Sequence, residues 1–286
     1  MSTPSGGLVA RTDDDQGFPE VNGRTIPAAG DRTFPAAGDR NFPEAGDRTI
    51  PEAGDRNFPE AGVRGFPETW VVVPLFCEAQ VIGAVVAGLR RRFDNVVCVD
   101  DGSTDDSAEV ARAAGAVVVR HAVNLGQGAA LQTGLAYALR DERTRSVVTF
   151  DADGQHRVED AAEMVARLHV EGLDALFGSR FLDGRTDLDR VRRLVLRAAV
   201  VYTNRTTGVR LTDAHNGLRV LSRHGAATLR ITHNRMTHAS EIVAQVGRGR
   251  LRWAEHPVHI LYTDYSRSKG QSLLNSINIL VESLLG

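Results

Sequence analysis

An α/β fold with a mostly parallel sheet is predicted for residues 69–286 from three observations. Short apolar runs alternate with helix-length amphipathic segments from Trp70 onward. Their order begins strand, helix, strand, helix, strand, which is typical of α/β proteins. Polar and acidic residues follow the strands directly, and an open parallel sheet binds ligands beyond the carboxyl ends of its strands. The sequence therefore predicts both the sheet and the edge that binds a ligand.

The first elements are predicted in order from their apolar pattern and length. Four strands are expected, at residues 70–75, 95–99, 116–120 and 146–150. Three amphipathic helices are expected between them, at about residues 79–91, 105–114 and 128–139. The domain is expected to end in an amphipathic helix near the C-terminus, where Leu273, Ile277, Leu280 and Leu284 have helical spacing.

The N-terminal residues 1–68 carry an internal repeat and are predicted to be a disordered arm. Prolines recur every eight residues from Pro19 to Pro67, in units such as GDRTFPAA. Each unit offers one large apolar residue, which is too little to bury against the entropy of ordering the chain. Two interpretations stay open: regularly spaced Phe-Pro hooks for a partner, and an expanded linker, which we favour.

Composition excludes few functions by itself. The chain has 286 residues and a net charge of −2, so bulk charge gives no attraction to nucleic acid or anionic lipid, and no nucleic-acid partner is expected. No signal peptide or run of about 20 apolar residues is visible. Cys77 and Cys98 lie in strand-like runs without a metal-binding pattern, so a reduced, cytoplasmic setting is expected. Lys269 is the single lysine among 34 basic residues.

Carboxylates follow the first two predicted strands. Glu78 comes after the first strand and Asp100 after the second. A carboxylate at such an edge can accept hydrogen bonds from a nucleobase or from ribose hydroxyls. Asp105 is more simply explained as a helix cap. The loop from Asn124 to Gly128 resembles a phosphate-approach loop, although glycine patterns alone are weak indicators.

The segment Asp151-Ala152-Asp153-Gly154-Gln155-His156 is the most informative one. Two carboxylates and an amide oxygen on one loop are hard oxygen ligands, suited to Mg²⁺ or Mn²⁺ while leaving positions for diphosphate oxygens. A calcium loop would need further acidic ligands that this spacing lacks. The segment therefore predicts a divalent metal held by Asp151, Asp153 and Gln155, with a plain solvated turn as the alternative.

The joint order of these motifs resembles family 2 glycosyltransferases with the GT-A fold. The motifs are PLFCEAQ, VDDGSTDDS, NLGQGAALQTG, FDADGQH, GSRF, TDAHNGLRV and SRSKGQS, which together cover about residues 70–272. Within the family they look most like the dolichyl- or polyprenyl-phosphate sugar synthases. Two departures stand out: Gln127 occupies a position where many relatives have lysine, and no C-terminal membrane spans follow.

The resemblance implies roles for particular residues. The donor would be a nucleotide sugar, with nucleotide-sugar contacts from Pro74, Glu78, Asp100, Asp101, Gly126, Asp151 and Asp153. Asp151, Asp153 and Gln155 would hold the metal and the diphosphate. Catalytic roles near the phosphates and the reacting centre would fall to Arg180, Asp213 and Arg219.

The acceptor stays open at this point. A polyprenyl phosphate is already anionic and needs positive charge around it, whereas a sugar hydroxyl needs a base. The acid-free segment 190–212, with Arg267 and Lys269, favours lipid phosphate at the inner face of the cell membrane, directly or through a small integral-membrane partner. For a hydroxyl of a glycan, Asp213 or Glu241 would be the base. A single displacement predicts inversion, and a non-catalytic nucleotide-sugar-binding module is the alternative of another class.

Overall fold

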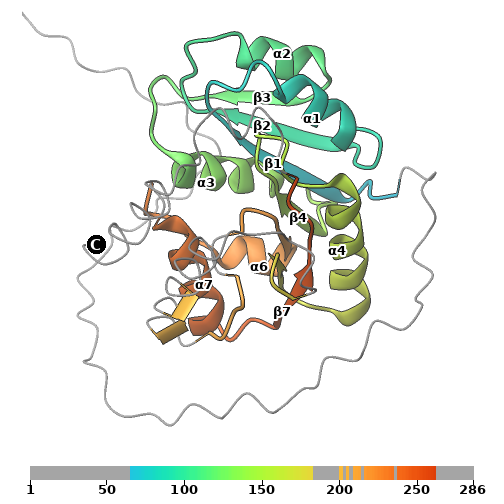
Figure 1. Ribbon diagram of the computed structural model, residues 1–286, viewed down its shortest axis with the longest axis vertical. Coiled ribbons are helices and arrows are strands. Elements are labelled where there is room, and N and C mark those ends of the chain that lie inside the picture. The colour runs from blue at the N-terminus through green and yellow to red at the C-terminus, as the bar shows by residue number, and fades with distance from the viewer. Residues whose placement is uncertain are drawn as a thin grey trace, which may run out of the picture. The chain divides into compact units, whose positions relative to one another are not determined.

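The computed structural model describes residues 65–182 and 200–261, apart from 202–203, 206–208, 214–215 and 235–236. Figure 1 shows these residues as a coloured ribbon. Several predicted features lie outside the described residues: nearly all of the N-terminal arm, most of the segment 190–212, Arg267 with Lys269, and the C-terminal helix. They remain predictions.

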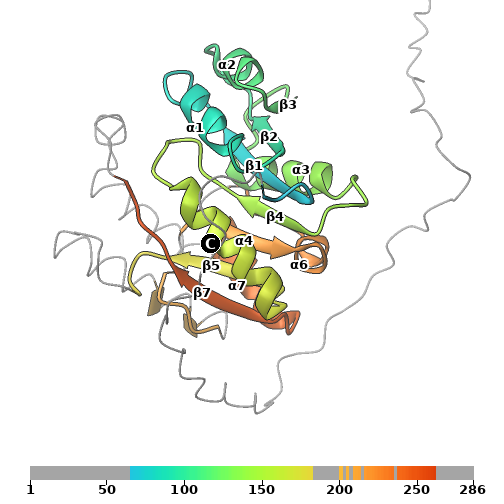
Figure 2. The ribbon, with the colours of Figure 1, turned by 90° about the vertical axis from the view of Figure 1, so that its right-hand side faces the viewer.

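A seven-stranded sheet in the order β3-β2-β1-β4-β6-β5-β7 forms the centre of the fold (Figure 2). All neighbouring pairs are parallel except those of β6, which runs antiparallel to both β4 and β5. The strands are β1 Thr69–Leu75, β2 Asn95–Asp100, β3 Val117–Arg120, β4 Ser146–Thr149, β5 Ala175–Ser179, β6 Arg219–Ser222 and β7 Trp253–Pro257. The predicted α/β class and the first four strands are confirmed.

Helices cover both faces of the sheet because the strands are apolar on both sides. One buried cluster joins the sheet to α1 (Ile82–Leu89), α2 (Ser107–Ala113) and α4 (Val158–Glu171). A second cluster joins the other face to α3 (Gln127–Ala138), α6 (Arg223–Thr228) and α7 (His238–Arg248). A parallel sheet that is buried on both faces needs such near-continuous apolar strands. The three predicted helices are confirmed, with slightly later starts for α1 and α2.

The antiparallel strand β6 determines where the polar groups meet. Its first residue, Arg219, pairs with Thr149 at the end of β4 and with Phe177 near the end of β5. The chain that enters β6 therefore lies at the same edge as the chain that leaves β4 and β5. This brings the loop after Thr149, the residues after Ser179 and the segment before Arg219 to one edge of the sheet.

Candidate active site

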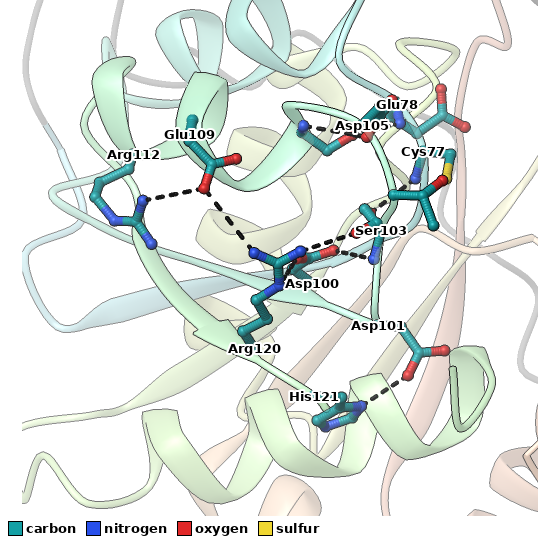
Figure 3. Close-up of polar contacts among 12 residues, drawn as sticks. Cys77, Glu78, Asp100, Asp101, Ser103, Asp105, Glu109, Arg112, Arg120 and His121 are labelled. Carbon is teal, nitrogen blue, oxygen red and sulfur yellow. Dashed lines mark hydrogen bonds and ion pairs between the residues drawn. The ribbon is translucent and has the colours of Figure 1, made fainter. Parts of the chain in front are cut away.

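Asp100 lies at the carboxyl end of β2 in a fully buried position. Arg120, at the end of β3, places its Nε 3.0 Å from Asp100 Oδ2, and the Ser103 amide donates to Oδ1 over 3.0 Å (Figure 3). Arg120 also donates to the Ser103 carbonyl over 2.9 Å. Both carboxylate oxygens thus have protein partners. Asp100 therefore fixes the sheet edge at which the nucleoside is predicted to bind. Its ion-pair partner Arg120 is half-exposed at the same edge.

The turn after β1 is tied to the turn after β2. The amides of Cys77 and Glu78 donate to the hydroxyls of Ser103 and Ser107, over 2.9 and 2.7 Å. Asp105 accepts from the Ser107 amide over 3.1 Å, but the N-cap position of α2 belongs to Asp106, so Asp105 fixes the entry into the helix from one residue before the predicted cap position. Cys77 has a φ of 53°, a left-handed conformation that is unfavourable for this residue type. These contacts hold Pro74 and Glu78, both half-buried, beside Asp100.

Asp101 acts on the glycine-rich loop. Its carboxylate accepts from His121 Nδ1 over 2.7 Å and from the amides of Leu125 and Gly126 over 2.9 and 2.7 Å. Figure 3 shows the contact with His121. Asp101 is buried and accepts from this loop through both carboxylate oxygens, so it positions the loop; its contact to the nucleotide sugar stays a prediction.

The glycines of this loop are required by a neighbouring segment of the chain. A Cβ on Gly126 would lie 2.2 Å from the Asn234 carbonyl oxygen, and one on Gly128 would lie 2.0 Å from that of His233. The Gly128 amide also donates to the Asn234 carbonyl over 3.1 Å. Close packing against residues 233–234 therefore explains why this loop contains glycines. The sequence alone had suggested that the glycines let a phosphate approach the backbone.

The DADGQH segment follows β4, as predicted, and Asp151 is its centre. His156 Nε2 lies 2.9 Å from Asp151 Oδ2, and Gln127 Nε2 donates to Oδ1 over 3.3 Å. Burial alone would raise the pKa of Asp151, but the hydrogen bond and charge of His156, with the charges of Arg219 and His238, hold this pKa below its usual value. Asp151 is therefore kept as an anion that is 30% exposed.

Asp153 has the opposite electrostatic environment. Burial, and then the charge of Asp151, raise its pKa to about 6. The Gln155 amide donates to its Oδ1 over 3.0 Å, while the Gln155 carbonyl accepts from the Leu261 amide over 2.8 Å. Two carboxylates that repel each other at a partly open site are an environment that a cation would stabilise.

The carboxylates fit a divalent metal for which the protein supplies only some of the ligands. Within the described ranges, no group of three or more His, Cys, Asp and Glu side chains is arranged to hold a metal alone. Asp151 and Asp153 offer hard oxygen ligands, and Mg²⁺-type sites commonly take one or two carboxylates and complete their shell with substrate phosphates and water. Asp151 and Asp153 are thus the residues that would hold the ion; the side-chain role of Gln155 stays a prediction.

Gly217 forms the floor beneath Asp151. A Cβ at this position would lie 2.0 Å from Asp151 Oδ2 and 2.4 Å from Oδ1. The Gly217 carbonyl accepts from the Thr149 hydroxyl over 2.7 Å, which fixes this backbone against β4. The carboxylate can therefore keep its position only while residue 217 lacks a side chain.

We expect Gly217→Ala to weaken Mn²⁺ binding by at least about tenfold, because displacing one ligand carboxylate costs on the order of 1.4 kcal/mol or more. Titration of the protein with Mn²⁺, followed by electron paramagnetic resonance, measures this change. Gly88→Ala in α1 is the matched control, since its Cβ would make an ordinary 3.5 Å contact with Val158. Unchanged Mn²⁺ affinity in Gly217→Ala would contradict the assigned position of Asp151.

Asp213 and Arg180 form an ion pair where the chain leaves β5. Arg180 Nε donates to Asp213 Oδ2 over 2.6 Å and its Nη2 to Oδ1 over 3.3 Å, while the Arg180 amide donates to Oδ2 over 3.2 Å. The Asp213 side chain is 1% exposed and that of Arg180 12%. The carboxylate therefore orients the guanidinium through a two-point contact, the geometry that only arginine provides.

Arg219 is the buried cation between the two acidic groups. It is among the largest fully buried side chains described. Burial lowers its pKa below the usual value, and the negative charges of Asp151 and Asp213 offset only part of that shift. The guanidinium is therefore electrostatically coupled to both carboxylates, and its catalytic role stays a prediction.

Glu241, the other candidate base, is engaged by the segment that covers α3. Its carboxylate accepts from the Thr232 hydroxyl over 2.6 Å and from the amides of Thr232 and His233 over 3.0 and 2.9 Å. Burial alone would raise the pKa of Glu241, but these hydrogen bonds lower it. The residue therefore holds the segment at residues 232–234 in place.

Comparison with known proteins agrees with this geometry. The sequence profile described as glycosyl transferase family 2 matches residues 70–230. An uncharacterized protein of Methanocaldococcus jannaschii is 34% identical over 76% of this chain and 90% of its own length. The UDP-N-acetylglucosamine–dolichyl-phosphate N-acetylglucosaminyltransferase of Methanococcus voltae is 25% identical over 76% of this chain and 94% of its own.

The solved structures agree at the level of the fold. Glucosyl-3-phosphoglycerate synthase from Mycobacterium tuberculosis superposes with a TM-score of 0.59, at 21% identity, over 76% of this chain and 79% of its own. The fold is that of a GT-A glycosyltransferase. The chain belongs to glycosyltransferase family 2 and is an enzyme of that family.

Four residues at the site were not singled out as site residues from the sequence: Arg120, Gln127, His156 and Glu255. Gln127 and His156 lie inside motifs, and only the fold shows that both contact Asp151. Arg120 pairs with Asp100 across a parallel strand pair, which register alone could have suggested. Glu255 carries no local signal, because its partners lie 42 and 43 residues away.

Proposed function

We propose that this enzyme moves a sugar from a nucleotide-sugar donor to a polyprenyl phosphate at a membrane surface, with a divalent metal and with inversion at the sugar carbon. The observation that carries the proposal is the state of the two candidate bases. Asp213 is held in an ion pair by Arg180, and Glu241 is bound by Thr232 and His233. A hydroxyl acceptor needs a base, whereas a phosphate acceptor is already a nucleophile at neutral pH.

Other observations support the same acceptor. The relative from Methanococcus voltae has dolichyl phosphate in its name as the acceptor. No helix among the described residues is long and apolar enough to cross a membrane. Association at the surface would then depend on residues outside the described ranges, among them Arg267 and Lys269, which we propose as contacts to the acceptor phosphate.

Different residues would bind the donor, the metal and the phosphate groups. The turns after β1 and β2, held together by Ser103 and Ser107, would seat the nucleoside. Asp151 and Asp153 would hold Mg²⁺ or Mn²⁺, which when bound neutralises the charge that develops on the departing nucleoside diphosphate. Asp213 holds Arg180 at the edge of the site, where its guanidinium would stabilise phosphate oxygens. The anionic acceptor would attack the sugar carbon directly, so the proposal includes no covalent enzyme intermediate.

Label transfer tests the acceptor. The full chain is incubated with radiolabelled UDP-, GDP- or dTDP-sugars, Mn²⁺ or Mg²⁺, and dolichyl or undecaprenyl phosphate, and the lipid is then extracted. We expect metal-dependent label in the lipid fraction, in a mild-acid-labile product of inverted anomeric configuration. Label in a water-soluble glycan would move the assignment to a hydroxyl acceptor, retained configuration would exclude the single displacement, and no turnover of any donor would contradict the proposal.

A further inference from the structure

Glu255 lies on β7, outside the motifs that identify the family. A single oxygen of its carboxylate, Oε1, accepts three hydrogen bonds from consecutive residues. The Thr212 amide and hydroxyl donate over 2.8 and 2.9 Å, and the Asp213 amide donates over 3.2 Å. Three donors that converge on one oxygen fix both the direction of the backbone and the hydroxyl of Thr212.

The backbone that Glu255 fixes is the one that carries Asp213. The Thr212 hydroxyl also lies 2.6 Å from the Ser179 hydroxyl, immediately before Arg180. Arg180 in turn contacts Asp213 through its amide and its guanidinium. On β7, two residues after Glu255, Pro257 pairs with Ser179 of β5. Contacts with β7 therefore hold both the backbone next to Arg180 and the backbone that carries Asp213.

A buried glutamate is energetically unfavourable at a position that needs only a hydrogen-bond acceptor for a turn. Burial raises its pKa, the hydrogen bonds from Thr212 lower it, and the nearby charge of Asp213 raises it further. Placing a second carboxylate beside a buried one is unfavourable, and a neutral acceptor could serve a turn at lower cost. The position combines an electrostatic penalty with strict geometry, which is typical of residues that hold a functional group in place.

We infer that Glu255 is a positioning residue for the Asp213–Arg180 pair, acting through the Thr212–Asp213 backbone without touching the substrate. This inference rests on the proposed function, in which Arg180 contacts phosphate oxygens. Releasing the turn would let Asp213 shift, and the guanidinium would shift with it. A displacement of about 1 Å of a positioning group can cost about a hundredfold in rate.

Three variants separate geometry from charge. Glu255→Ala removes the acceptor; Glu255→Gln keeps an oxygen acceptor for the three donors but removes the charge. The matched control is Glu163→Ala, a half-exposed glutamate of α4 whose carboxylate lies 3.6 Å from His256, the next residue of β7. If Glu255→Ala does not fold, Thr212→Val takes its place, because it removes the hydroxyl that contacts both Glu255 and Ser179.

Hydrogen exchange gives a readout that needs no substrate. In Glu255→Ala we expect amide exchange in the peptide containing Thr212 and Asp213 to speed up by about tenfold, because the net stabilisation by one hydrogen bond corresponds to a factor of about that size. Glu255→Gln and Glu163→Ala should exchange as the wild type does. Unchanged exchange in Glu255→Ala, or in Thr212→Val if that variant is needed, would overturn the inference whatever the activity of the wild type.

Kinetics with the most active donor and acceptor of the transfer panel complete the test. For Glu255→Ala, or Thr212→Val in its place, we expect kcat to fall by about thirtyfold to a hundredfold while the KM for the nucleotide sugar changes by less than about threefold. Glu255→Gln should recover most of kcat. Loss of kcat in Glu255→Gln equal to that in Glu255→Ala would show that the charge matters and not the turn, and would overturn the inference. An inactive wild type with the expected exchange pattern would count against the proposed function alone.

Discussion

Replacing Asp153 with alanine is expected to lower the transfer rate at saturating donor by about a thousandfold or more. The carboxylate is one of two that would hold the metal, and losing electrostatic stabilisation of a leaving group costs about 4 kcal/mol at the transition state. Burial and the charge of Asp151 raise the pKa of Asp153 to about 6, so the ionised carboxylate is unfavourable without a cation. We therefore expect Asp153 to contribute to metal binding and not to the stability of the fold.

Steady-state rates with the best donor, over a series of Mn²⁺ concentrations, measure the effect. Asp106→Ala is the matched control, because this aspartate is exposed and makes no side-chain cap to α2. The melting temperature of Asp153→Ala should equal or exceed that of the wild type in the absence of metal, since a repelling carboxylate has been removed. Activity within tenfold of the wild type would contradict the assignment of Asp153.

Replacing Arg180 with alanine is expected to lower the free energy of unfolding by about 3 kcal/mol, in addition to abolishing transfer. The substitution removes the guanidinium that donates to both oxygens of the buried Asp213 carboxylate, and breaking a buried ion pair costs about 3–5 kcal/mol. Asp213 is 2% exposed as a residue, so solvent cannot replace the guanidinium. We choose the lower end of the range because Arg180 itself is 12% exposed.

A double-mutant cycle in urea separates the pair from its surroundings. Arg180→Ala with Asp213→Ala should be more stable than Arg180→Ala alone, because no uncompensated carboxylate remains at residue 213. The control is Arg143→Ala, which breaks an exposed pair with Asp141 and should leave the urea midpoint close to that of the wild type. A cost below 1 kcal/mol for Arg180→Ala would show that the two residues are not paired in solution.

Much of the fold and the centre of the site could be predicted from local sequence. The apolar runs and their lengths located β1 to β4: β1, β2 and β4 are largely buried, and the edge strand β3 is apolar although its residues are partly exposed. The acidic DADGQH segment could be placed at a strand end because the run Val147-Val148-Thr149-Phe150, with three apolar residues, ends immediately before it. The family followed from the order of motifs, and the comparisons confirm it.

The remainder depends on contacts between distant parts of the chain. The strands β5, β6 and β7 were not predicted individually, and the antiparallel direction of β6 is what places Arg219 at the edge where β4 and β5 end. The pairing of Arg180 with Asp213 spans 33 residues, and that of Glu255 with Thr212 spans 43. Asp213 and Glu241 were candidate bases because acidic residues suit that role; only their hydrogen-bond partners show that both are engaged.

The position of the metal tests the account most directly. Crystals of the protein grown with Mn²⁺ and UDP, and in parallel with Mn²⁺ and GDP, can be measured at a wavelength where manganese scatters anomalously. We expect an anomalous peak within coordination distance of the Asp153 carboxylate and of the diphosphate, on the side of Asp151 away from Gly217. A manganese peak that contacts the diphosphate but neither Asp151 nor Asp153, or a bound diphosphate without manganese, would contradict it.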